Sequence, residues 1–349
     1  MSTSVYSGTK SFAVRGQLLS YNTLDELADS DSLETFVSKL KGTAYGEFVS
    51  DLAKPYDAVS IELALQRRLA KVARSMITAT SNSPVLKAYY SKFLASNLKN
   101  ILKGLALEKS YEDISRFVDL YVEELVGTRD IIVRALASRR LDEAVSTLRS
   151  TEYGEAAEAA VKSFLETRNF QVIDLYIDRA YYKSLLQGFL SERKDKRDLR
   201  EIIAVDVDAY NVTTVLRARE WGLQPGEAEE LIVEPEFRVP REILVSLARS
   251  ESPSESIAQI DRTPYAGVIT QQDTSNPAWI SVLEGNFEAL RLRAARRTFT
   301  WDIFSISEAL GILRLLEYEI RALSAVAFGI EQHIPRNEIM QNLSWFKTD

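Results

Sequence analysis

The chain has 349 residues, of which 46% are hydrophobic and 27% are charged, a composition that indicates a globular protein with a substantial core. This length exceeds the roughly 250 to 300 residues over which a single core extends, so two or three domains are expected. The formal net charge of −7 argues against a nucleic-acid backbone binder, and the absence of cysteine excludes disulfides, thiolate zinc sites and thiol nucleophiles.

The composition also predicts the type of fold. No stretch approaches the roughly 18 to 20 apolar residues of a membrane-spanning helix, and the first residues lack the apolar core of a signal peptide. We therefore expect any membrane contact to be made through partners. With 14 glycines and 9 prolines, the chain has too few turn residues for a large β-sandwich or barrel, whereas Leu, Ala, Glu, Lys and Arg fill long segments. The sequence predicts an all-α fold.

A Thr-x-Tyr signature occurs three times, and its residues are Thr43 and Tyr45, Thr151 and Tyr153, and Thr263 and Tyr265. The threonines are 108 and 112 residues apart, much further than the 20 to 50 residues of solenoid repeats, so each repeat is domain-sized. Threonine can cap a following helix; Glu47 and Glu155 would lie in its first turn, and Pro264 would take the first helical position. We interpret the signature as a structural device that marks a helix start, with a binding role as the alternative.

A helical stripe follows the first signature. Ile61, Leu65, Leu69, Val72 and Met76 recur at spacings of 4, 4, 3 and 4 residues. These spacings put the five side chains on one face of a helix, so we expect them to face the core.

A second set of matching segments spans residues 87–106, 202–220 and 311–329. Aligned without a gap, Asn97, Asn211 and Ala322 coincide at spacings of 114 and 111 residues, nearly the period of the first signature. The same alignment superposes Leu94, Asp208 and Glu319, and also Lys103, Arg217 and Phe328. We expect the polar members to bridge helices inside each domain, with partner contacts as the alternative. The repeats predict three domains, at 1–108, 109–224 and 225–349.

The reactive side chains do not suggest an enzyme. His333 is the single histidine, and neither G-x-x-x-x-G-K-[ST] nor G-x-G-x-x-G occurs, so we predict no catalytic residue, metal ligand or cofactor. A hydrolase could use the carboxylate pairs Asp206 with Asp208 or Glu317 with Glu319. On a helix, however, residues i and i+2 point away from each other by about 160°, which weakens both pairs.

A cluster of arginines lies in EALRLRAARR at residues 288–297. Arg291, Arg293, Arg296 and Arg297 have only Glu288 close by to balance their charge. A solvated helix face and a basic patch for an acidic partner are both compatible with this pattern. We name the four arginines as candidate interface residues.

Several stretches occur in an order and spacing that resemble a known family. They are Tyr6, Arg15, Leu18 and Leu19, LDEL at 24–27, SLETFVSKLKGTAYGE from residue 32, DAYNVTTVLRAR at 208–219 and EYEIRAL at 317–323. Together they resemble the C subunit of the archaeal and bacterial V/A-type rotary ATPases, related to the d subunit of V-ATPases, along the whole chain. Order, spacing and total length carry the resemblance, because no single motif is as specific as a phosphate-binding loop.

The resemblance implies three similar helical domains arranged as a funnel around a pseudo-threefold axis. It implies a non-catalytic central-stalk protein, peripheral on the cytoplasmic side of the membrane, that links the D and F subunits of the stalk to the cytoplasmic loops of the proteolipid ring. Such a protein would transmit torque and so couple ATP synthesis or hydrolysis to proton or sodium transport, without cofactor, small-molecule substrate or nucleic acid. The alternative from another class is an α-helical scaffold unrelated to rotary ATPases.

Overall fold

Helices form all the regular structure in the computed structural model, which describes residues 3–193, 196–301 and 304–343. The predicted all-α class is confirmed. Six helices are long: α5 (Ala58–Ala79), α6 (Pro84–Ala106), α12 (Val172–Ser191), α13 (Lys196–Glu220), α17 (Trp279–Trp301) and α18 (Ile306–Glu331). The shorter ones are α1 (Thr3–Arg15), α2 (Tyr21–Ala28), α3 (Leu33–Leu40), α4 (Gly46–Val49), α7 (Tyr111–Ser115), α8 (Leu120–Glu124), α9 (Arg129–Leu136), α10 (Leu141–Leu148), α11 (Gly154–Thr167), α14 (Pro225–Glu230), α15 (Arg241–Arg249), α16 (Pro253–Ile260), α19 (Arg336–Asn342) and the 3₁₀ turn η1 (Asp273–Ser275). Within these ranges no helix has both the length and the apolar character that crossing a membrane requires.

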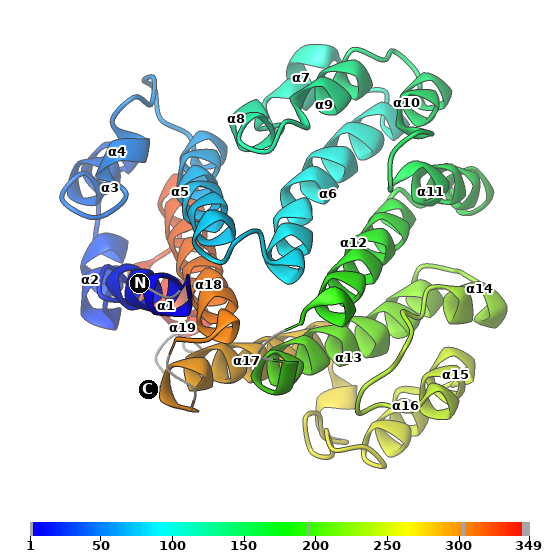
Figure 1. The fold of residues 1–349 in the computed structure, drawn as a ribbon. Helices are drawn as coiled ribbons and strands as arrows, with labels where there is room; N and C mark the ends of the chain where they lie inside the picture. The colour runs from blue at the N-terminus through cyan, green and yellow to red at the C-terminus, as the bar shows by residue number, and fades with distance from the viewer. Residues whose placement is uncertain (1–2, 194–195, 302–303, 344–349) are drawn as a thin grey trace.

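The long helices pack in three pairs, α6 with α12, α13 with α17, and α5 with α18. Figure 1 shows the pairs arranged about a common centre, with the shorter helices toward the outside. The third pair joins the two ends of the chain, because α18 also contacts α1, α2 and α3. The N-terminal helices and the C-terminal helix therefore complete one another's packing.

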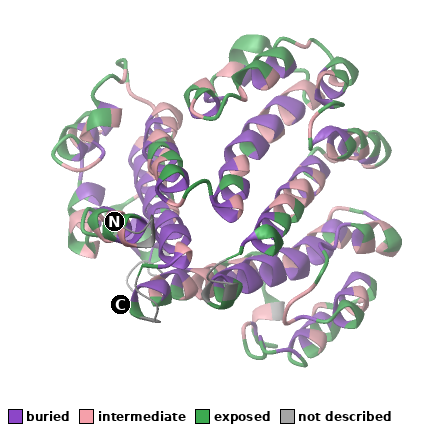
Figure 2. Cartoon of the chain, viewed as in Figure 1, coloured by how far each residue is buried: buried purple, intermediate pink, exposed green. Residues whose placement is uncertain are grey.

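Apolar surface explains the pairing of α5 with α18. Ile61, Leu65, Leu69 and Met76 are fully buried along α5, with Val72 at the edge of the stripe, as predicted. Helix α18 is buried on nearly every side, and such a helix needs neighbours all round it. Figure 2 shows buried residues following the long helices and exposed residues concentrated on the outer, shorter ones.

A tight turn separates α5 from α6. Ser81 and Asn82 have φ values of 56° and 67°, in the left-handed region that ends a helix, and Pro84 then begins α6. As a result α6 packs on α12, and α13 likewise packs on α17, so these pairs combine helices from both sides of residues 108 and 224. The division into domains 1–108, 109–224 and 225–349 stays a prediction.

The three signature threonines make the same two hydrogen bonds. In the first repeat the Thr43 hydroxyl donates to the carbonyl of Leu40 at 2.7 Å and accepts from the amide of Tyr45 at 3.1 Å. The corresponding distances are 2.7 and 3.2 Å at Thr151 and 2.7 and 3.1 Å at Thr263. The signature therefore builds one local turn three times.

The helix starts predicted from this signature are confirmed in two of the three repeats, but the threonines do not cap these helices: the N-caps are Tyr45 and Tyr153, and neither makes a side-chain capping bond. Helix α4 begins at Gly46 and α11 at Gly154, directly after the signature tyrosines. The third prediction is wrong, because residues 263–268 form turns and Pro264 begins no helix. Gly267 has a φ of 75°, which interrupts helical geometry three residues after the proline.

Candidate functional site

A polar pocket of about 550 Å³ lies between the three pairs of long helices. Its lining comes from α5, α6, α12, α17 and α18, together with the segment around α8. Many of the lining side chains carry charge, which is unusual for the centre of a helical protein. The pocket therefore brings together charged side chains from helices that are far apart in the sequence.

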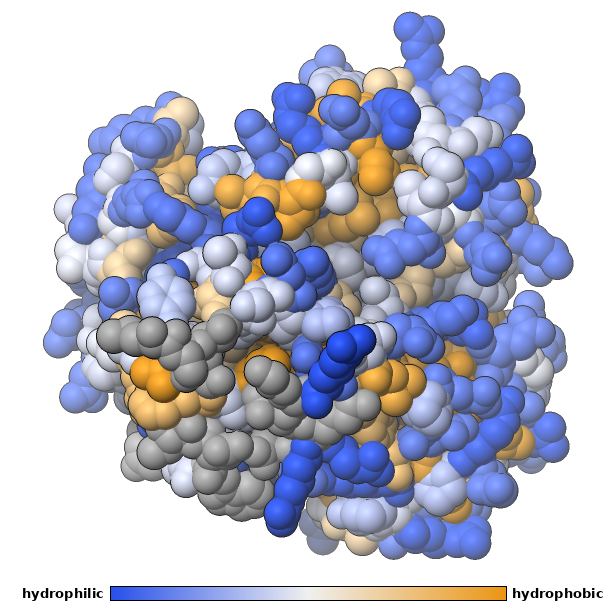
Figure 3. Space-filling model, in the orientation of Figure 1, coloured by the Kyte–Doolittle hydropathy of each residue, from blue (hydrophilic) through white to orange (hydrophobic). Residues whose placement is uncertain are grey.

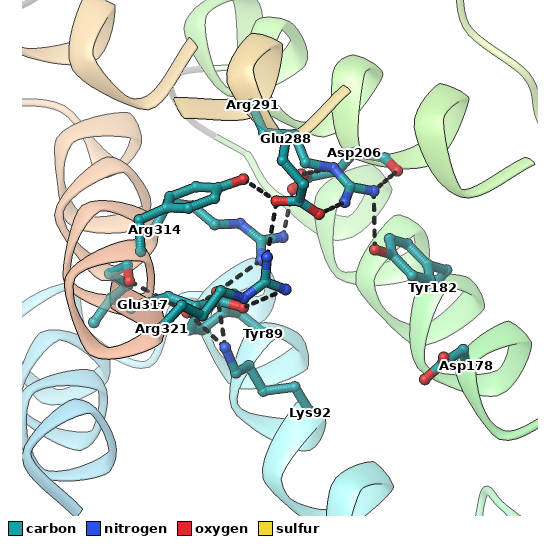
Figure 4. A network of polar contacts seen from close by, with 12 residues as sticks. Tyr89, Lys92, Asp178, Tyr182, Asp206, Glu288, Arg291, Arg314, Glu317 and Arg321 are labelled. Carbon is teal, nitrogen blue, oxygen red and sulfur yellow. Dashed lines mark hydrogen bonds and ion pairs between the residues drawn. The ribbon is translucent and has the colours of Figure 1, made fainter. Parts of the chain in front are cut away.

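One branch of a charge network crosses the pocket from α6 to α13 through α18 (Figure 4). The Lys92 ammonium lies 2.8 Å from a carboxylate oxygen of Glu317, and Arg314 lies 3.1 Å from the same oxygen. Tyr89 donates a hydrogen bond to that oxygen at 3.0 Å. Arg314 also forms an ion pair with Asp206. These contacts tie α18 to its neighbours on both sides.

A second branch joins α17 to the other helices. Arg291 lies 2.6 Å from Glu288 and 3.3 Å from Asp206, and it donates to the Tyr182 hydroxyl at 3.2 Å. Arg321 of α18 lies 3.0 Å from the second oxygen of Glu288. Figure 4 shows the two branches meeting at Asp206, so one connected network links α6, α12, α13, α17 and α18.

Burial and mutual pairing set the protonation of this network. Burial alone would raise the pKa of Glu317, but Lys92, Arg314 and Arg321 lower it well below its ordinary value. Burial lowers the pKa of Lys92 to about 8, although the Glu317 carboxylate opposes that shift. The pKa of Glu288 is also lowered, because Arg291 and Arg321 outweigh its burial. Glu317 and Glu288 are therefore ionised at neutral pH, and each depends on nearby cations to offset its desolvation.

The network contains one equivalent residue from each repeat. Lys92, Asp206 and Glu317 stand two residues before Leu94, Asp208 and Glu319, so they occupy one repeat position. Sequence reasoning named Asp206 and Glu317 only as carboxylates of a possible hydrolase and did not align them with Lys92, although a charged residue at this position in all three repeats was a usable signal. The partners Arg291 and Arg321 could not be assigned, since only the fold brings them to Glu288.

The next polar position of the repeats points away from the pocket. Asp208 accepts a hydrogen bond from the Tyr265 hydroxyl at 2.8 Å and others from the amides of Arg238 and Val239. Glu319 accepts from the Tyr45 hydroxyl at 2.7 Å and pairs with Arg68 at 3.0 Å. Burial raises the pKa of both carboxyl groups. Two of the three signature tyrosines thus hold a carboxylate of a long helix.

The remaining signature tyrosine, Tyr153, has a neutral partner. Leu94 stands where the other long helices have a carboxylate, and the Tyr153 hydroxyl donates instead to the backbone carbonyl of Ser91 at 3.2 Å.

The two candidate carboxylate pairs of a hydrolase do not assemble. Asp206 points to Arg314 while Asp208 points to Tyr265. Glu317 likewise points to Lys92 while Glu319 points to Tyr45. These directions agree with the expected separation of residues i and i+2, so neither pair places two carboxylates on one reacting group.

The repeated asparagines make matching backbone contacts. Asn97 bonds both the carbonyl and the amide of Asp119, at 3.2 and 3.1 Å. Asn211 bonds both groups of Val233, at 3.0 and 2.8 Å. In each case the partner lies 22 residues further along the chain. Each asparagine therefore fixes the returning segment against its long helix.

The cations six residues later link the two helices of a pair. Lys103 of α6 lies 2.9 Å from Asp174 of α12, and Arg217 of α13 lies 2.7 Å from Glu284 of α17. Phe328, at the same repeat position of α18, is 54% exposed. The third pair thus lacks this ion pair.

The four candidate interface arginines separate into two groups. Arg291 points into the central pocket and is held by Glu288 and Asp206. Arg293, Arg296 and Arg297 instead line a groove on another side of α17, together with Arg15. Among the described residues no group of three His, Cys, Asp or Glu side chains is placed to hold a metal.

Fold and site define an internally repeated helical protein whose three long-helix pairs are cross-linked by charge at their centre. The chain belongs to the ATP synthase (C/AC39) subunit family, whose model matches residues 9–342. It is 28% identical to the A-type ATP synthase C subunit of Desulfurococcus sp., over 96% of this chain and 89% of that protein. The C subunits of Thermococcus onnurineus and Methanocaldococcus jannaschii are 27% and 24% identical, over 96% and 90% of this chain and 88% and 80% of theirs.

Proposed function

We propose that this chain is the non-catalytic central-stalk C subunit of an A-type or V-type rotary ATP synthase/ATPase. The observation that carries the proposal is a family match that covers nearly the whole chain rather than one segment. The chain's relatives are named as C subunits of the A-type ATP synthase. In this role it links the D and F subunits of the stalk to the proteolipid ring and transmits torque, so that ATP synthesis or hydrolysis is coupled to proton or sodium transport.

The arrangement of the helices supports the torque-bearing part of this proposal. A coupling element has to rotate as one body, and the central network resists separation of the helix pairs because each opening would strand buried charges. We infer three similar helical domains, at 1–108, 109–224 and 225–349, that form a funnel about a pseudo-threefold axis, with the pairs of α6 with α12 and of α13 with α17 joining one domain to the next. The pair of α5 with α18 would close this funnel with both ends of the chain.

The proposed location is the cytoplasmic side of the membrane, with membrane contact made by partners. The described helices offer no membrane span, which fits a peripheral protein. The proposed role needs no cofactor, nucleic acid or small-molecule substrate. An unrelated α-helical scaffold is not favoured, because such a protein would share helical repeats but not a family match over residues 9–342.

The test is ATP-driven ion pumping in vesicles that carry the complex with and without this chain. We expect pumping to be lost without it and restored by adding it back, while ATP hydrolysis by the catalytic sector continues in the same samples. Undiminished pumping in its absence would overturn the proposal.

A further inference from the structure

A groove of about 840 Å³ lies where α17 meets α18 and the connection between α1 and α2. Four arginines line it: Arg15, Arg293, Arg296 and Arg297. Its wall also contains apolar side chains such as Leu18 and Leu292 and polar ones such as Ser20 and Thr300. This concentration of positive charge stands out in a chain whose formal net charge is −7.

Among the described residues that line the groove, Glu319 is the one carboxylate, and it already has hydrogen-bond partners outside the groove. Glu319 is 1% exposed and accepts hydrogen bonds from Tyr45, Arg68 and the amide of Leu19. The Glu319 carboxylate is therefore neutralised by Arg68 of α5 rather than by the groove arginines. Among the residues that the structure describes, Arg15, Arg293 and Arg297 have no acidic partner at the groove.

Three of the arginines make few contacts of their own. Arg15 packs over the ring of Phe299 at 4.7 Å, and Arg293 bonds only a backbone carbonyl in its own helix, at 3.4 Å. The Arg297 side chain forms no ion pair or hydrogen bond with the residues that the structure describes. By contrast, Arg291 on the same helix is held by two carboxylates. Three planar guanidinium groups are thus left available around one hollow.

The geometry points to an acidic loop of a protein partner in the rotary complex as the occupant of this groove. Guanidinium groups bind carboxylates through paired hydrogen bonds, and the leucines would contact the aliphatic parts of such a loop. A projecting loop can enter a hollow, whereas a flat bilayer surface meets protruding charges first. The inference rests on the proposed function, because it requires a rotary complex that contains such a partner. Its new content is that these arginines make the contact.

Charge reversal of two exposed groove residues tests this assignment. Arg293→Glu with Arg297→Glu leaves α17 with no lost ion pair, so the variant should fold like the wild type, as checked by circular dichroism and thermal unfolding. The matched control is Arg129→Glu with Arg134→Glu, which makes the same charge change on exposed α9 residues, far from α17 in Figure 1. Arg293→Lys with Arg297→Lys keeps the charge but loses the planar fork. Figure 3 shows that hydrophilic residues cover most of the face seen in Figure 1, with smaller hydrophobic patches between them.

Binding is measured for the full chain with three probes: the purified D–F subcomplex, the proteolipid ring in nanodiscs, and vesicles containing phosphatidylserine. We expect the wild type and the control variant to bind one of the two protein probes with equal affinity. The charge-reversed variant should bind that probe at least about tenfold more weakly, and the affinity of the lysine variant should lie between the two. Added salt should weaken wild-type binding more than variant binding.

The possible outcomes separate the groove from the function. Equal binding by the wild type and the charge-reversed variant to the same protein probe would overturn the groove assignment and leave the proposed function standing. Arginine-dependent binding to the lipid vesicles, with no change toward either protein probe, would also overturn it. Failure of the wild type to bind either protein probe would overturn the proposed function and this inference together.

Discussion

Replacing Glu317 by glutamine should destabilise the protein far more than a similar change at an exposed ion pair. The substitution removes the carboxylate that lies 2.8 Å from Lys92 and 3.1 Å from Arg314. Those cations are 17% and 9% exposed, so water replaces the lost charge poorly. Breaking one side of a buried ion pair costs about 3 to 5 kcal/mol. Because Arg314 keeps Asp206 and Lys92 can lose its proton, we expect about 2 to 3 kcal/mol here.

Equilibrium unfolding in urea measures this cost. The matched control is Glu47→Gln, which breaks a pair with Lys71 whose side chains are 67% and 51% exposed, and which should cost less than about 1 kcal/mol. A double-mutant cycle with Lys92→Met should give a coupling energy of about 1 to 3 kcal/mol for the central pair. The reasoning would be refuted by equal costs for the two glutamine substitutions, or by a coupling energy near zero.

Three further measurements test single contacts. Tyr45→Phe removes a hydrogen-bond donor from the buried Glu319 and should lower the free energy of unfolding in urea by about 1 to 3 kcal/mol. Tyr153→Phe loses a longer hydrogen bond to a backbone carbonyl and should cost less. The reverse order of these two costs would contradict the contacts. Asn211→Ala should cost about 2 to 3 kcal/mol, because it strands both backbone groups of Val233, and a loss under about 0.5 kcal/mol would show that water replaces them. The lowered pKa of Lys92, about 8 when folded, means that the unfolded chain binds more protons between about pH 8 and 10.5, so this group's contribution to stability rises with pH in that window. The difference in unfolding free energy between wild type and Lys92→Met should therefore grow by about 1 to 2 kcal/mol from pH 8 to 9.5, and a constant difference would argue against the shift.

The sequence predicted those features that depend on local pattern and on repetition. Helical spacing identified the buried stripe of α5, and the repeat alignment placed Asn97 and Asn211 at one position, although they bond the backbone of Asp119 and Val233 rather than bridging helices inside each domain as expected. The two-residue separation of Asp206 and Asp208 predicted opposite directions, because the helical period fixes them. These predictions succeeded since each needs only one helix or two copies of it.

Features that depend on distant parts of the chain could not be predicted in this way. The pairing of α5 with α18 joins segments more than 200 residues apart, and helical periodicity does not name a helix's partner. The left-handed turn at Ser81 and Asn82 redirects α6 within a few residues. Arg291 was placed in a surface patch with its sequence neighbours, but the helical period turns Arg293, two residues later, away from the pocket and toward the groove.

The charges at the common repeat position explain how three similar units can meet at one centre. Three like charges at this position would repel one another, whereas Lys92, Asp206 and Glu317 bring one cation and two anions, and arginines from α17 and α18 supply the balance. The pairs converge most strongly on α18, which is tied to α6 by Lys92, to α13 by Asp206 and to α17 by Glu288. That helix is also the one whose own partner, α5, comes from the opposite end of the chain. The network therefore ties α18 to α6, α13 and α17, whereas the pair of α5 with α18, where the chain gives no covalent continuity, is held by apolar packing and by the buried ion pair of Arg68 with Glu319.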